Sequence, residues 1–177
     1  MKYSKNAWLS GAIALAATLF ILFGGQAIYQ NFAVAKPLDK AFADIEGVKA
    51  VAWEKAKDDK AITLRVSLAG TPNLQLTYTT IEDKARAILG KGELNIVISD
   101  SRTEELEQAY HEMHLYIQEA VATGRFSQMA DQVKEKAAKA GVDSRVYVDS
   151  QNIYLQLAKD SAELYTVIPR TNEPGVK

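Results

Sequence analysis

The hydrophobic and polar positions divide the chain into one continuous apolar stretch and a longer, patterned region. No charged side chain occurs from residue 6 to residue 35, and residues 7–29 consist mostly of alanine, leucine, isoleucine and phenylalanine. A helix of this length spans roughly 30 Å at 1.5 Å per residue, which matches the hydrocarbon core of a bilayer. Trp8 and Tyr29 bracket the stretch, and such rings prefer the headgroup level. The pattern predicts a transmembrane helix over about residues 7–29.

The flanks of this stretch bear on its orientation and processing. Lys2 and Lys5 precede it without any acidic residue, which favours a cytoplasmic amino terminus and an extracytoplasmic main domain. Ala33 and Ala35 offer the small residues that signal peptidase requires, but the apolar stretch ends about a dozen residues earlier and is long for a cleavable signal. We therefore expect residues 1–35 to form an uncleaved signal anchor and exit segment. A protein secreted after cleavage at Ala35 is the alternative.

The region 36–170 begins with a helical pattern followed by strand patterns. Leu38, Phe42 and Ile45 recur at helical spacing and predict a helix that Gly47 closes. Apolar and polar residues then alternate, which is typical of half-buried strands. Strands are predicted at 48–55, 61–69 and 73–78, the first two joined by a solvated hairpin tip within 54–60.

Two capping boxes predict the starts of the next helices. Thr79 with Glu82 indicates a helix to residue 89, and Ser101 with Glu104 indicates a longer one. The apolar run at 94–99 between them is typical of a strand buried on both faces. Gly124 and Gly141 are expected to end two successive helices. Three further strands are predicted at 144–149, 152–158 and 163–168, followed by a frayed tail at 171–177.

These patterns predict an α/β or α+β domain, with a mixed sheet covered by helices, after an amino-terminal transmembrane helix. A helix, a glycine and three strands recur from Gly47 and again from Gly141. The region 36–170 is therefore either two related α-β-β-β modules, 36–99 and 100–170, or one domain with chance similarity between amphipathic segments. Small α-β-β-α-β modules recur in bacterial envelope assemblies, which is an analogy of fold alone.

Composition narrows the classes of function. Cysteine is absent, so disulfides, thiolate nucleophiles and cysteine-based metal sites are excluded. Of the 21 basic residues only Lys2 and Lys5 precede Lys36, while all 22 acidic residues follow it, so the main domain has a net charge of −3. A mildly acidic domain without a basic run argues against nucleic acid as a partner.

Both histidines of the chain lie in one predicted helix. His111 and His114 are three residues apart and Glu107 lies one turn before His111, so these three are the candidate metal ligands. The zinc-hydrolase pattern needs a second histidine four residues after the first, where this chain has Leu115. Asp100 and Ser101 end a predicted strand, a position where α/β sheets commonly hold ligands. We assign no catalytic residue and no cofactor from the sequence.

The leading hypothesis is a non-enzymatic, single-pass envelope protein whose extracytoplasmic α/β domain mediates protein–protein interaction or assembly. Trp53 and three strand tyrosines, Tyr147, Tyr154 and Tyr165, suit half-buried strands and would serve as partner contacts if exposed. One alternative is a membrane-tethered hydrolase or metal-binding enzyme that uses His111 and His114. Another is a cytoplasm-facing membrane adaptor, if the orientation is reversed.

Overall fold

The computed structural model describes residues 36–55, 61–90 and 92–170. The predicted transmembrane helix, the Ala35 cleavage site, the hairpin tip at 56–60 and the tail at 171–177 lie outside these residues. Within them, no helix is long and apolar enough to cross a membrane. The elements in chain order are α2 (Lys36–Phe42), β1 (Val48–Lys55), β2 (Ala61–Leu68), α3 (Leu74–Leu89), β3 (Glu93–Ser99), α4 (Glu104–Thr123), α5 (Phe126–Ala140), β4 (Asp143–Val148), β5 (Asn152–Lys159) and β6 (Ala162–Pro169).

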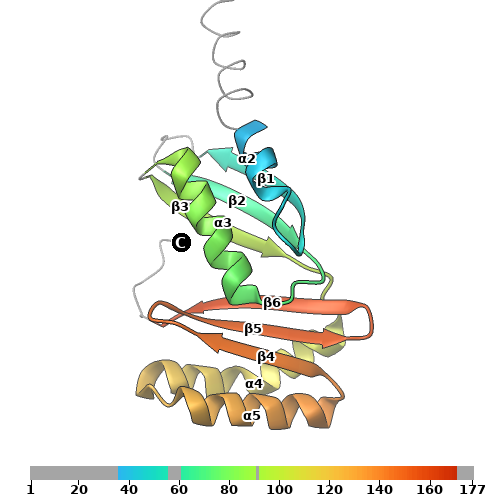
Figure 1. Cartoon of the computed structure of the whole chain (residues 1–177). Coiled ribbons are helices and arrows are strands. Elements are labelled where there is room, and N and C mark those ends of the chain that lie inside the picture. Colours follow the sequence, from blue (N-terminus) through green and yellow to red (C-terminus); the bar gives the residue numbers. More distant parts are fainter. Residues whose placement is uncertain (1–35, 56–60, 91, 171–177) are drawn as a thin grey trace, which may run out of the picture.

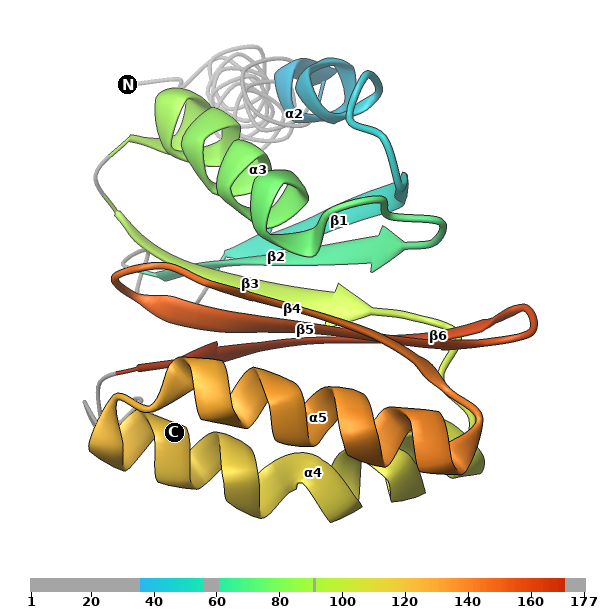
Figure 2. The ribbon, with the colours of Figure 1, turned by 60° about the horizontal axis from the view of Figure 1, so that its bottom comes forward.

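The strands form two three-stranded sheets, which confirms a mixed α/β architecture (Figure 1). In the first sheet β1 pairs antiparallel with β2, and β2 pairs parallel with β3. In the second sheet β4, β5 and β6 form an antiparallel meander. Helices α2 and α3 pack on the first sheet, while α4 and α5 cover the outer face of the second (Figure 2).

The two units follow different orders of elements. The first unit, 36–99, runs α-β-β-α-β, because α3 lies between its second and third strands. The second unit, 100–170, runs α-α-β-β-β. The predicted repetition of one α-β-β-β order is therefore wrong for the first unit.

The segment 73–78, predicted as a third strand, is the start of α3. The Asn73 side chain caps this helix, since its Oδ1 accepts a hydrogen bond from the Leu76 N–H at 3.0 Å. Leu74, Leu76 and Tyr78 alternate in sequence, but Leu76 is 65% exposed. The buried positions of α3 instead follow the helical period, at residues 74, 77, 81 and 85.

The two predicted capping boxes are also wrong. Thr79 lies inside α3, where its hydroxyl donates to the Gln75 carbonyl. The cap of α4 is Thr103 rather than Ser101. The helix ends at Gly124 and Gly141 are confirmed, because both glycines adopt the left-handed conformation.

The sequence predicted that the strand at 94–99 is buried on both faces, and this prediction is wrong. The strand that is buried on both faces is β5. β3 lies at the edge of its sheet and exposes Asn95 and Ser99. β5 lies centrally in the second sheet, with Ile153, Leu155 and Leu157 packed among α4 and α5. Its opposite face carries Tyr154, which belongs to the hydrophobic cluster of the first unit together with Tyr165 of β6. The core of the first unit is thus completed by residues of the second.

Candidate functional site

The loop between β2 and α3 is joined to the second unit by buried hydrogen bonds, a cluster that we call the joint. Gln156 is 7% exposed; its Oε1 accepts from the Leu74 N–H at 2.9 Å and its Nε2 donates to the Thr71 carbonyl at 2.8 Å. Tyr165 Oη accepts from the Thr71 N–H at 3.1 Å. Because these bonds satisfy backbone groups that are out of contact with water, they fix the two units relative to each other.

The other side of this loop lies against Gly47. The Gly47 carbonyl accepts from the Ala69 N–H at 2.8 Å, and Gly47 has a φ of +90°. A Cβ atom on Gly47 would lie 2.2 Å from Thr71 Oγ1. That hydroxyl is buried and has no hydrogen-bond partner among the described residues. Only glycine therefore fits at residue 47.

The segment after β3 binds the outer edge of β6. The Tyr165 N–H donates to Asp100 Oδ2 at 2.8 Å, and the Glu163 N–H donates to Ser101 Oγ at 3.1 Å. Arg102 Nε donates to Asp100 Oδ1 at 2.8 Å, and this hydrogen bond is the main cause of the raised pKa of Arg102. Asp100 and Ser101, which the sequence marked as a possible ligand position, are thus engaged in holding β6.

The direction of these bonds shows which backbone groups of β6 point outward. In an antiparallel strand the N–H and C=O of one residue point to the same side, and the side alternates along the strand. The backbone N–H groups of Glu163 and Tyr165 point away from β5, so the backbone N–H of Val167 does too. The Val167 N–H makes no hydrogen bond with any described residue on that side. Pro169, the next outward position, has no N–H.

A groove of about 340 Å³ opens along this edge of β6 and beside β3. We call it the edge groove. Its apolar and aromatic members are partly or fully buried, apart from the exposed Pro169, and its polar members lie at the rim. The apolar and aromatic members are Tyr78, Ile96, Ile98, Tyr165, Val167 and Pro169. The polar members are Asn95, Arg102, Asn152 and Thr166. Since β3 and β6 are both edge strands, the groove offers unpaired backbone as well as apolar side chains.

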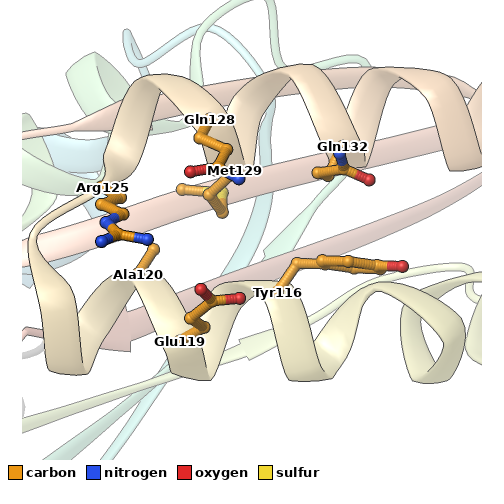
Figure 3. A pocket seen from close by; sticks show the side chains of 7 residues that line it. All are labelled: Tyr116, Glu119, Ala120, Arg125, Gln128, Met129 and Gln132. Carbon is orange, nitrogen blue, oxygen red and sulfur yellow. The ribbon is translucent and has the colours of Figure 1, made fainter.

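Two other hollows lie elsewhere among the described residues. A polar one of about 550 Å³ lies beside the joint, where Arg145 Nη1 donates to the Pro72 carbonyl at 2.8 Å. A second, between α4 and α5, has a volume of only about 60 Å³. Figure 3 shows that the side chains around it come from the facing helices and the Arg125 corner between them.

A carboxylate and a phenol connect the β4–β5 turn to the first unit. Tyr154 Oη donates to Asp149 Oδ2 at 2.7 Å, and the Gln151 and Asn152 N–H groups donate to Asp149 Oδ1 at 2.8 Å each. Burial acts to raise the pKa of Asp149, but these hydrogen bonds outweigh it and hold that pKa below its ordinary value. Burial and the bond to Asp149 both raise the pKa of Tyr154. The Tyr154 ring also meets the Tyr78 ring edge-on, at 5.8 Å between centroids.

Replacing Tyr154 by phenylalanine is expected to lower the free energy of unfolding by about 2 kcal/mol near neutral pH, because a hydrogen bond to a charged group is lost. Since the folded pKa of Asp149 is depressed, the ionised carboxylate stabilises the fold above the unfolded pKa. This contribution disappears as the pH falls through the folded pKa. The difference in free energy of unfolding between the wild-type protein and Tyr154→Phe should therefore shrink at about pH 2. Urea unfolding at both pH values measures it, and an equal difference at both would contradict the assignment.

The candidate metal ligands do not converge in the structure. His111 is exposed on α4. His114 is half-buried, and its ring lies edge-on to the Tyr110 ring with 6.1 Å between the ring centroids. Glu107 lies with its Oε1 3.9 Å from Arg102 Nη1. Across residues 36–55, 61–90 and 92–170, no group of three histidine or acidic side chains is placed to hold a metal ion.

The residues that form the joint and the edge groove were not identified as a site from the sequence. Tyr154 and Tyr165, named there as half-buried strand residues, are buried between the units, while Tyr147 and Trp53 are half-buried. Gln156 carried no signal beyond its place in an alternating strand. No family model matches the chain, and no curated protein or solved structure matches it either.

Proposed function

We propose that this chain is a single-pass membrane protein whose extracytoplasmic α/β domain binds another protein of the envelope, without catalysing a reaction. The uncharged apolar stretch at 7–29 supports the anchor. The observation that supports the binding role is the edge groove, where two edge strands from two units meet beside apolar side chains. Exposed strand edges of this kind serve as docking sites for further chains.

The rigid connection between the units supports the same role. Each wall of the edge groove comes from a different unit, with Ile96 on β3 and Val167 on β6. The joint fixes these walls through Gln156, so the groove exists before any partner arrives. A preformed site binds without the cost of ordering its walls.

Photo-crosslinking in intact membranes tests this function. A photoreactive amino acid in place of Asn95, which is exposed at the rim of the edge groove, is expected to give a crosslinked product with a partner. The same amino acid in place of Gln118, exposed on α4, is the matched control and should give none. Absence of a product at residue 95, or equal products at both residues, would overturn the proposal. If amino-terminal sequencing of the native protein gives a sequence that begins at Lys36, the anchor is cleaved and that part of the proposal fails.

A further inference from the structure

The polar hollow of about 550 Å³ beside the joint is lined by both units, and we call it the joint hollow. Residues 70–72 of the first unit form one wall. Its floor belongs to the second sheet and includes Asp143, Arg145, Gln156, Ala158 and Glu163. These five lie on the same sheet face as Tyr154 and Tyr165, which is turned toward the first unit. A hollow of this volume between two units is typical of small-molecule sites.

One row of the floor offers hydrogen-bond acceptors. Asp143, Ala158 and Glu163 are register partners across β4, β5 and β6, so their side chains lie side by side on one face. Ala158 has only a methyl group, which leaves room between the two carboxylates. Glu163 Oε2 accepts from the Gly70 N–H at 2.7 Å, whereas Asp143 is exposed and makes no hydrogen bond or ion pair with a described residue. The space above Ala158 therefore favours a positively charged donor such as an ammonium group.

The next row of the floor offers donors. Arg145 and Gln156 are register partners on β4 and β5. Arg145 Nη1 donates to the Pro72 carbonyl, which holds the guanidinium against the loop, and Arg145 has no ion pair with a described residue. Gln156 Nε2 carries two hydrogens, of which one is donated to the Thr71 carbonyl. The other amide hydrogen and the remaining guanidinium N–H groups are available to a carboxylate.

The spacing of the two rows sets the length of a matching ligand. Asp143 and Arg145 are two residues apart on β4, so the rows are separated by roughly 7 Å. A ligand that satisfies both rows carries an ammonium group and a carboxylate about this far apart. Two extended amino-acid residues span about 7 Å, whereas a single amino acid spans about half of that distance. The joint hollow therefore matches the length of a dipeptide with free termini.

We propose that the joint hollow binds a small zwitterionic compound of dipeptide length, with its ammonium group between Asp143 and Glu163 and its carboxylate on Arg145 and Gln156. This inference goes beyond the proposed function, because it concerns a small ligand rather than a protein partner. The joint hollow also shares no lining residue with the edge groove. A ligand with only one sign of charge is a poorer occupant, since it leaves one row unsatisfied.

Isothermal titration calorimetry of the full-length protein in detergent micelles tests this inference. The probe is alanyl-alanine with free termini. The matched compounds are its N-acetyl form, which lacks the ammonium group, its carboxyl-terminal amide, which lacks the carboxylate, and alanine, which is too short to reach both rows. We expect saturable binding of alanyl-alanine and at least about ten-fold weaker binding of each of the other three. No saturable binding of alanyl-alanine, or equal affinity for all four compounds, overturns the inference.

Two variants assign the two ends of the ligand. Asp143→Asn should reduce the preference for alanyl-alanine over its N-acetyl form at least about three-fold and leave the preference over the amide. Arg145→Gln should reduce the preference over the amide at least about three-fold and leave the preference over the N-acetyl form. The preference that persists shows in each case that the variant is folded. Asp131→Asn, at an exposed position on α5, is the matched control and should keep both preferences. Unchanged preferences in Asp143→Asn or in Arg145→Gln overturn the inference.

Discussion

Replacing Gly47 by alanine is expected to lower the free energy of unfolding by about 4 kcal/mol, because backbone strain and overpacking act together. The φ of +90° disfavours any residue with a Cβ. That Cβ would also lie 2.2 Å from Thr71 Oγ1 and 2.9 Å from Thr71 Cα, so the backbone of the loop would have to move. Chemical denaturation of the protein in detergent, followed by circular dichroism, measures the effect.

Gly70→Ala is the matched control for this prediction. Gly70 also has a positive φ, of +67°, but apart from its two chain neighbours no described residue has an atom within 4 Å of the position that its Cβ would take. We expect a loss of only about 1 kcal/mol, from the backbone conformation alone. Adding Thr71→Ala to Gly47→Ala should restore part of the stability, since the nearest clashing atom is then absent. Equal losses for the two glycine variants would show that the contact with Thr71 does not matter.

Gln156→Leu is expected to lower the free energy of unfolding by about 2–5 kcal/mol, because it leaves two buried backbone groups without partners. These groups are the Leu74 N–H at the start of α3 and the Thr71 carbonyl. Leucine has a similar size, so loss of packing contributes little. Chemical denaturation gives the total loss, and hydrogen exchange should show faster exchange at the Leu74 amide.

The control for this change is Gln118→Leu, which replaces an exposed glutamine on α4. It is expected to change the free energy of unfolding by less than about 0.5 kcal/mol. If Gln156→Leu is equally mild, or the Leu74 amide exchanges at its original rate, then the Gln156 amide does not hold the joint.

Local patterns in the sequence were sufficient to predict α4, α5 and all six strands, because each of these elements shows one kind of pattern clearly. The segment 73–78 is compatible with two different periods. Leu74, Leu76 and Tyr78 alternate as in a strand, while Leu74, Thr77 and Ile81 follow the helical period. Asn73 is a strong helix cap, and it favours the helix that the structure contains.

The site depends on contacts that local patterns do not carry. Gln156 bonds to the Leu74 N–H across 82 residues, and Asp100 bonds to the Tyr165 N–H across 65. Tyr154 was expected to suit a half-buried strand, yet Tyr154 and Gln156 are both buried against the first unit. The edge groove arises from this packing of two sheets, so no single stretch of sequence predicts it.

The shared core of the first unit has a consequence for synthesis of the chain. Tyr154 and Tyr165 complete that core, and Tyr165 bonds to a loop residue 94 positions earlier. At 5–20 residues per second, the ribosome takes roughly 5–20 s to add that length. During this interval the apolar surfaces of α3 and β3 that will meet the two tyrosines stay uncovered. The nascent first unit is therefore expected to depend on chaperone protection until β6 has emerged.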